Sequence, residues 1–266
     1  MWRALRSLMI GVVLVVALIA SACGTAGRPG QTGPAAPATS SAPAPASPSP
    51  SGTPPSVPPS PPLPPRTLRL GMAGADVRNL QVRLAALRYY PGTADGQFGQ
   101  NTLEALWAFQ AIQGLVPTGI AGPATRRALA NPRSPGALVP DGGALRVEID
   151  LSRQVLVLYR SGEVALISHI SSGGGYYYCS PDGGCGYAVT PTGDFHTTAY
   201  LPGWVTVPLG EMYDPVFFIG TSYAIHGSAS VPLQPVSHGC VRIPMLVAEV
   251  FHNLVPVPGT PVYIRR

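Results

Sequence analysis

The sequence of 266 residues contains no lysine, and all 17 of its basic residues are arginine. Charged residues make up only 11% of the chain, and the formal net charge is +5. The arginines are dispersed, without an Arg-rich run or a platform of aromatic residues. An Arg-rich run or an aromatic platform is typical of nucleic-acid-binding proteins, and their absence argues against a nucleic acid as partner.

The N-terminal apolar run is too short for a transmembrane helix. It extends from Leu8 to Ala20, which is 13 residues (20 − 8 + 1), whereas a spanning helix needs about 20. Arg3 and Arg6 precede it, as the basic region of a signal peptide precedes its apolar region. We therefore expect residues 1–22 to be a signal peptide and the rest of the chain, with a net charge near +3 (5 − 2), to be exported.

Cysteine is scarce, and the four cysteines differ in their surroundings. Cys179 and Cys185 bracket a short Gly-rich loop without a histidine between them. Since a structural zinc ion normally takes four ligands, we expect a disulfide there and no metal. Cys240 is left without a partner, which in an exported protein indicates a reactive thiol or an intermolecular link.

Cys23 lies directly after the apolar run, in Ala20-Ser21-Ala22-Cys23-Gly24. This segment resembles a bacterial lipobox, although Ala20 replaces the larger aliphatic residue usual there. The resemblance implies lipidation of Cys23 and attachment to the outer face of the cytoplasmic membrane. The alternative is cleavage after Ala-Ser-Ala, which would release a soluble protein.

Residues 23–66 are dominated by Pro, Ala and Ser, with Arg28 as the only charge before Arg66. Without large apolar side chains the segment has no means of forming a core, and we expect it to be disordered. A Pro-rich chain extends by ~3.1 Å per residue, which suits a tether into the cell wall. The competing interpretation is a Pro-rich ligand for an adaptor domain.

Residues 67–131 predict a bundle of three short helices. Leu80 and Leu84 belong to a first set of apolar residues at helical spacing. We expect Asn101 to cap a second helix, and Pro123 to lie in the first turn of a third. Gly114 ends the second helix.

This segment also carries a recurrent series of motifs, namely Asp95-Gly96-Gln97-Phe98-Gly99, Thr102, Phe109-Gln110, Gly114-Leu115 and Thr118-Gly119. The series resembles the peptidoglycan-binding domain of the three-helix type. The resemblance implies binding to the cell wall. The alternative is a spacer domain that has lost this binding.

After a Pro- and Gly-rich boundary at residues 132–143, residues 144–266 predict a mainly β domain. Leu145 to Leu151 alternate between apolar and polar, as in a half-buried strand, and Val155–Tyr159 form an apolar run, as in a strand covered on both faces. A strand at Pro261–Ile264 closes the chain. Only Pro244–Leu254 has the apolar face of a helix.

The chemistry is concentrated near the C-terminus, in His226-Gly227 and in Ser237-His238-Gly239-Cys240-Val241-Arg242. A cysteine beside glycine, with histidines nearby, suits thiol acyl transfer: the thiolate attacks, an imidazole takes the proton, and backbone N–H groups stabilise the oxyanion. The alternative is a buried structural cysteine flanked by metal-binding or core histidines.

These two segments, in which His226 and Cys240 are 14 residues apart (240 − 226), resemble the L,D-transpeptidases with their YkuD-type catalytic domain, a β-sandwich with a short helix. Asp150–Gln154 and Thr190–Phe195 match further motifs of that family. The resemblance implies that Cys240 is the nucleophile and His226 its base, oriented by a backbone carbonyl. It further implies an oxyanion hole from the N–H groups of His238, Gly239 and Cys240, with Ser237 and Arg242 holding the loop by hydrogen bonds.

Met212, Tyr213 and Tyr223 are expected by analogy to line the acyl-donor groove, with ordinary sheet packing as the alternative. For His169, His196 and His252 we expect structural or surface roles.

The resemblance implies a peptidoglycan L,D-transpeptidase without metal or cofactor. Its partners would be stem peptides and glycan, with carbapenems as inhibitors, and its product a 3-3 cross-link formed through a Cys thioester. One alternative is an L,D-carboxypeptidase, in which water resolves the thioester. The other is a non-catalytic lipoprotein that only anchors to peptidoglycan.

Overall fold

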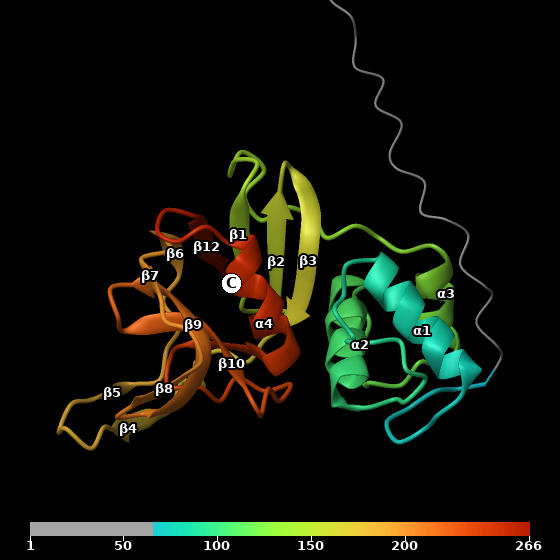
Figure 1. The fold of residues 1–266 in the computed structure, drawn as a ribbon, viewed down its shortest axis with the longest axis horizontal. Coiled ribbons are helices and arrows are strands. Elements are labelled where there is room, and N and C mark those ends of the chain that lie inside the picture. The colour runs from blue at the N-terminus through green and yellow to red at the C-terminus, as the bar shows by residue number, and fades with distance from the viewer. Residues whose placement is uncertain (1–65) are drawn as a thin grey trace, which may run out of the picture. The chain divides into compact units, whose positions relative to one another are not determined.

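The structure is a computed structural model that describes residues 66–266 (Figure 1). The predictions for the signal peptide, for Cys23 and for the Pro-rich segment up to residue 65 lie outside the described residues. Within residues 66–266, no helix is long and apolar enough to cross a membrane.

The helical domain consists of α1 (Ala75–Ala86), α2 (Gln100–Ile112) and α3 (Pro123–Ala130). Their apolar residues recur at three- and four-residue intervals and so face one core, which contains Val77, Leu80, Leu84, Leu106, Phe109 and Leu129. Pro123 occupies the first turn of α3, as predicted. The prediction for Asn101 was wrong: the N-cap is Gly99, and Asn101 lies in the first turn of α2.

Two buried glutamines hold the loops between these helices. Gln81 accepts a hydrogen bond from the Gly96 N–H at 2.8 Å and donates to Thr102 Oγ1 at 3.0 Å. Gln110 accepts from the Gly119 N–H at 2.9 Å and likewise donates to a threonine at the start of the next helix. The Asp95-Gly96 and Thr118-Gly119 motifs therefore have the same role. In each, the glycine N–H donates a hydrogen bond to a buried glutamine side chain.

The β domain contains two packed five-stranded sheets. The first has the order β3-β2-β1-β12-β6, with bounds Glu163–His169, Val155–Arg160, Arg146–Asp150, Pro261–Arg265 and Gly193–His196. The second has the order β11-β10-β9-β7, with β8 also paired to β9; the bounds are Val241–Pro244, Tyr223–Ser228, Gly210–Ile219, Ala199–Tyr200 and Trp204–Val207. A helix, α4 (Met245–Leu254), packs on β9 and β10, and β4 (Tyr177–Cys179) pairs with β5 (Cys185–Tyr187) as a separate hairpin.

Strand β2 is covered on both faces, as its apolar run predicted. Leu156 and Leu158 point into the core between the two sheets. Val157 and Tyr159 point the other way and join the core of the helical domain, because successive side chains of a strand alternate in direction. The Ile167 N–H of β3 also donates to the Arg88 carbonyl at 2.8 Å. The helical domain therefore packs directly on the outer face of this sheet.

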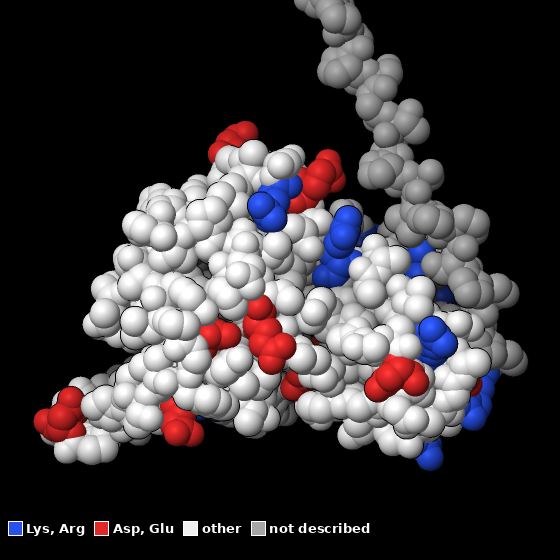
Figure 2. Space-filling model, in the orientation of Figure 1, with Lys and Arg blue, Asp and Glu red and all other residues white. Residues whose placement is uncertain are grey.

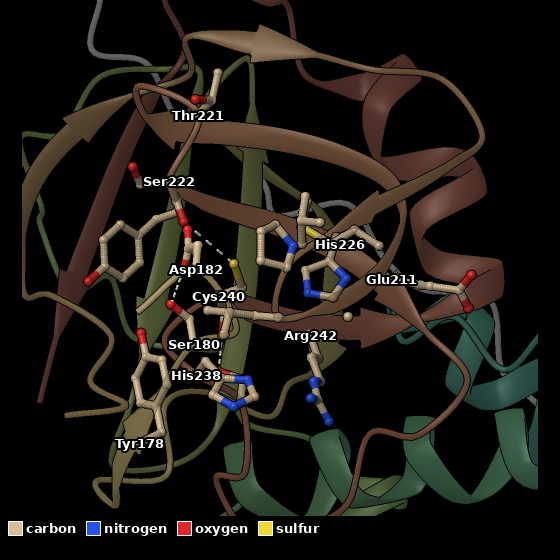
Figure 3. Close-up of a pocket in the computed structure, with 17 residues that line it drawn as sticks. Tyr178, Ser180, Asp182, Glu211, Thr221, Ser222, His226, His238, Cys240 and Arg242 are labelled. Carbon is tan, nitrogen blue, oxygen red and sulfur yellow. Dashed lines mark hydrogen bonds between the residues drawn. The ribbon is translucent and has the colours of Figure 1, made fainter. Parts of the chain in front are cut away.

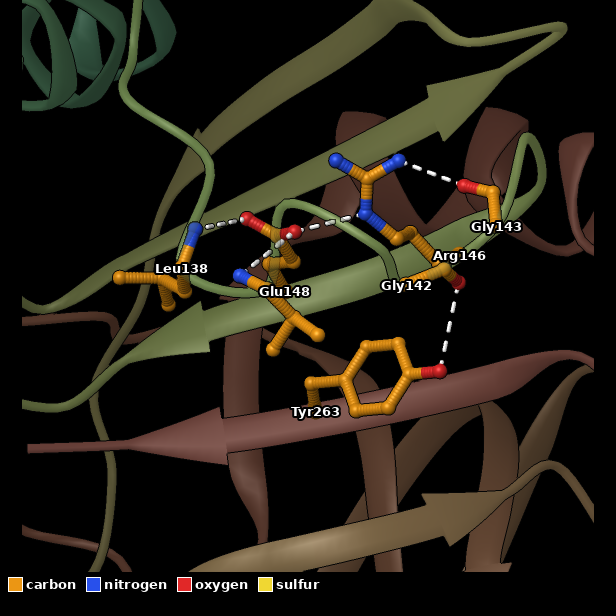
Figure 4. Close-up of polar contacts among 7 residues, drawn as sticks. Leu138, Gly142, Gly143, Arg146, Glu148 and Tyr263 are labelled. Carbon is orange, nitrogen blue, oxygen red and sulfur yellow. Dashed lines mark hydrogen bonds and ion pairs between the residues drawn. The ribbon is translucent and has the colours of Figure 1, made fainter.

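Strand β1 was predicted to be half-buried, and this prediction was wrong: all five of its residues are buried. Its polar residues can be buried because they form hydrogen bonds with one another and with the segment that precedes the strand (Figure 4). Arg146 Nε donates to Glu148 at 2.6 Å, and Glu148 accepts from the Leu138 N–H at 2.8 Å. The Arg146 guanidinium also lies 3.7 Å above the Tyr159 ring. The boundary segment is thus fixed to the β domain.

Candidate active site

The two chemically important segments meet on adjacent strands. Strands β10 and β11 are parallel neighbours, with His226 opposite Arg242. Cys240 directly precedes β11, so its thiol lies at the end of this strand pair. Figure 3 shows the thiol and the His226 imidazole facing the same cavity, which has a volume of about 440 Å³.

His226 is a buried imidazole in a defined tautomer. The residue is only 5% exposed, and its Nδ1 lies 2.9 Å from the Gly227 carbonyl oxygen. A carbonyl only accepts hydrogen bonds, so Nδ1 carries the proton and Nε2 keeps its lone pair. Burial, with a smaller effect of the Arg242 charge, lowers the pKa of His226 to about 4. The imidazole is therefore uncharged at physiological pH, and its Nε2 is free to accept a proton.

Cys240 is partly exposed to the cavity, and its Sγ lies 4.0 Å from the Ser222 carbonyl oxygen. Burial raises the pKa of the thiol, against opposing effects of the Ala224 N–H and of Arg242. Both partners are therefore neutral at rest. These two pKa shifts disfavour a preformed thiolate–imidazolium pair.

The loop before Cys240 is held from within. Ser237 Oγ donates to the Cys240 carbonyl at 2.6 Å and accepts from the Gly239 N–H at 3.0 Å. The Gly239 N–H, one of the three donors expected for an oxyanion hole, is thus engaged by Ser237 in this structure. Among the described residues, no hydrogen-bond acceptor is found for the N–H groups of His238 and Cys240.

Gly239 has a backbone conformation that requires glycine. Its φ is +142°, and a Cβ there would lie 2.7 Å from Tyr223 Cε1 and 3.0 Å from the Val189 carbonyl oxygen. The Gly239 carbonyl accepts from Thr190 Oγ1 at 2.7 Å. The Thr190–Phe195 motif therefore supports the loop directly.

The Asp150–Gln154 motif supports the same loop through one intermediate residue. Gln154 donates to Ser172 Oγ at 2.8 Å and accepts from the Ser172 N–H at 2.9 Å. The Ser172 carbonyl in turn accepts from the Ser237 N–H at 2.9 Å. This motif thus positions the loop before Cys240 without reaching the cavity.

Comparison with known proteins identifies two families in the chain. Residues 144–264 match the L,D-transpeptidase catalytic domain, and residues 73–129 match a peptidoglycan binding domain. The crystal structure of an L,D-transpeptidase from Xylanimonas cellulosilytica is similar with a TM-score of 0.69 and 37% identity, covering 78% of this chain and 100% of that one. The chain belongs to the L,D-transpeptidase family.

Two curated relatives match shorter segments. A zinc D-Ala-D-Ala carboxypeptidase from Streptomyces albus G is 50% identical over 64 residues, which are 22% of this chain and 24% of the relative. An N-acetylmuramoyl-L-alanine amidase, CwlM, from Mycobacterium tuberculosis is 48% identical over 56 residues, 21% of this chain and 14% of the relative. The chain thus spans about a quarter or less of these relatives.

In this L,D-transpeptidase family member a disulfide-linked hairpin forms one wall of the cavity. Cys179 and Cys185 are bonded, as expected, and join β4 to β5. Ser180 and Asp182, in the turn between them, line the cavity. Sequence reasoning missed both residues, although their position between two bonded cysteines was a signal for an ordered loop.

His238 is held at the rim of the cavity by the same hairpin. The Tyr178 ring lies 4.7 Å from the His238 ring, edge to face, and the Tyr176 ring lies 5.6 Å from it. Burial and the Arg242 charge lower the pKa of His238. The His238 ring is thus fixed by aromatic contacts with the hairpin.

The expected groove residues separate into two groups. Met212 and Tyr223 line the cavity. Tyr213 does not: it packs with the core, its ring 5.2 Å from that of Trp204. Neighbouring residues of β9 point to opposite faces of the sheet, so Met212 and Tyr213 could not both face the substrate.

The remaining histidines lie away from the cavity. His169 is buried, with its ring 5.3 Å from that of Trp107 and Nε2 3.1 Å from the Pro232 carbonyl. His252 stacks on Tyr200 at 4.7 Å, and His196 is exposed on β6. Within residues 66–266, no group of three or more His, Cys, Asp or Glu could hold a metal ion. Figure 2 shows arginines scattered over one face of these residues.

Proposed function

We propose that this protein is a peptidoglycan L,D-transpeptidase that forms 3-3 cross-links between stem peptides. The observation that carries the proposal is the placement of Cys240 and a neutral His226 around one cavity, in a chain that belongs to the L,D-transpeptidase family. The match of residues 73–129 to a peptidoglycan binding domain supports the cell wall as the substrate.

In the first half-reaction, the thiol of Cys240 attacks the carbonyl of the third stem residue, a diamino acid. His226 Nε2 takes the thiol proton as the S–C bond forms, and the N–H groups of His238 and Cys240 stabilise the oxyanion. The imidazolium then protonates the leaving nitrogen as the C–N bond breaks. Terminal D-alanine departs, and a thioester remains on Cys240.

In the second half-reaction, the side-chain amine of a neighbouring stem attacks the thioester. His226 accepts a proton from this amine and returns it to the sulfur as the C–S bond breaks, which regenerates the resting pair. Attack by water would instead release a tripeptide, so the two alternatives differ only in the nucleophile of this step.

The deciding experiment is analysis of the products that the purified full-length protein forms from tetrapeptide stems. We expect a cross-linked dimer and one D-alanine released per cross-link. Free tripeptide as the main product would assign a carboxypeptidase instead. Unchanged stems would favour a wall-anchoring protein without catalysis, and Cys240→Ala provides the inactive reference.

The residues before the described part of the chain carry our proposal for where the protein is located. We propose that the signal peptide (residues 1–22) directs export and that Cys23 carries a lipid anchor, with residues 23–66 as tether. Two acyl chains suffice for stable membrane attachment, whereas a single short one is marginal. Cys23→Ser should therefore shift the protein to soluble fractions or leave it as precursor. Membrane fractionation of a processed Cys23→Ser protein like that of wild type would rule lipidation out as the anchor.

A further inference from the structure

Arg242 carries a cation in the cavity that no neighbouring group neutralises. Within residues 66–266, its guanidinium forms no hydrogen bond and no ion pair, although the backbone of Arg242 pairs with Ser171 in both directions at 3.0 Å. The hydrogen bonds expected of Arg242 are therefore made by its backbone, and its side chain contributes none of them. The other charged residues of the cavity wall, Asp182 and Glu211, do not pair with it.

We propose that Arg242 binds the C-terminal carboxylate of the donor stem, the carboxylate of the residue that leaves. This inference rests on the proposed transpeptidase function and adds the group that recognises the leaving residue. A planar guanidinium with five N–H donors matches a carboxylate in two parallel hydrogen bonds.

The spacing along β11 favours this particular carboxylate. Residues i and i+2 of a strand lie on one face, roughly 6.6 Å apart, so Arg242 projects on the same side as Cys240. One residue of extended peptide spans at most ~3.6 Å, which keeps the terminal carboxylate within one residue of the carbonyl under attack. The side-chain carboxylate of a diamino acid lies several bonds farther away.

The position of His226 supports the same carboxylate. His226 lies opposite Arg242 on the neighbouring strand (Figure 3), and it must protonate the leaving nitrogen. That nitrogen is one carbon away from the terminal carboxylate. A leaving residue with its amine at His226 therefore brings its carboxylate toward Arg242.

Binding of this carboxylate also assists the chemistry. The Arg242 charge lowers the pKa of His226 in the empty site. A bound carboxylate offsets this charge, so it favours the imidazolium that forms when Cys240 attacks. Donor binding and activation of the base are thereby coupled.

The test compares two donor tetrapeptides that differ only in a C-terminal carboxylate or carboxamide. For the full-length wild-type protein we expect kcat/KM for acylation to be about 10- to 100-fold higher with the carboxylate, the range for a hydrogen-bonded charge pair. A third donor, with the diamino acid side chain amidated, should react like the first. If side-chain amidation causes the loss instead, Arg242 does not read the terminal carboxylate.

The variants separate recognition from general electrostatics. Arg242→Gln should lose most of the preference between the two donors, while Arg242→Lys should keep part of it because a lysine retains the charge without the fork. A mere effect on the pKa of Cys240 or His226 would lower both rates equally and leave their ratio unchanged, which would overturn the proposal. Arg160→Gln, at an exposed position of β2, is the charge-matched control.

The wild-type comparison needs no variant, so the proposal remains testable if Arg242→Gln fails to fold. Equal rates of the two donors on wild type would contradict it and leave the transpeptidase function intact. Absence of acylation with every donor would contradict the proposed function itself.

Discussion

The low pKa of His226 predicts an unusual pH dependence for the acylation of Cys240. With a pKa of about 4, about 90% of the histidine is neutral at pH 5. An ordinary histidine with a pKa near 6.5 would be about 3% neutral at that pH. The structure therefore predicts that the acylation rate at pH 5 is within a factor of about two of the rate at pH 7, rather than some 25-fold lower.

The assay is the rate at which a carbapenem forms a covalent adduct, followed by acid quench and intact-mass spectrometry between pH 4 and 8. His226→Ala is the matched control and should be slower by ~100-fold or more without this pH profile. A wild-type rate that falls with a midpoint near pH 6.5 would contradict this prediction, since it would mean that His226 titrates as an exposed histidine or that another group is the base.

The same pKa shift makes the folded protein less stable at low pH, so the assay needs a control for unfolding. The unfolded chain binds a proton at His226 below pH 6.5, whereas the folded chain binds it only near pH 4. The free energy of unfolding therefore falls as the pH drops through this window, by about 2 kcal/mol at pH 5. Circular dichroism at each pH shows whether the protein is still folded.

Three further substitutions test other parts of the structure. Gly239→Ala should reduce adduct formation by about 10-fold or more without unfolding the protein, because its Cβ would meet the Tyr223 ring at 2.7 Å; intact-mass kinetics measure this, and a normal rate would show that the loop adapts. Burial raises the pKa of Glu104 to about 7, so Glu104→Gln should stabilise the protein by about 1–3 kcal/mol at pH 8 and not at pH 4; urea unfolding at the two pH values checks this, and equal effects would contradict it. Glu148→Ala leaves the buried Arg146 charge unpaired and should cost about 3–5 kcal/mol in urea unfolding, whereas a loss below 1 kcal/mol would mean that water reaches the pair.

The meeting of Cys240 and His226 at one cavity could be predicted from sequence because the motif is local. Cys240 and the loop residues before it are contiguous, and His226 is only one crossover away, on the neighbouring parallel strand. Such short connections leave little freedom in how the residues meet. The Asp182 side of the cavity could not be predicted in this way, because a hairpin some sixty residues earlier supplies it.

The pattern of polar and apolar residues predicted where the strands lie better than it predicted what covers each of their faces. Arg146 and Glu148 alternate with apolar residues and were therefore expected to face solvent, yet each is buried because the other neutralises it. Met212 and Tyr213 were both expected in the groove, but the strand directs only Met212 there. The period of a pattern determines which residues share a face, while long-range contacts determine what covers it.

Whether Cys240 carries the acyl group is decided by the intact mass of the protein after brief reaction with a donor tetrapeptide and an acid quench. We expect an increase equal to the tripeptide acyl group, with D-alanine lost, that maps to the Cys240-containing peptide and is absent in Cys240→Ala. An adduct that persists in Cys240→Ala, or one that retains the terminal D-alanine, would contradict it.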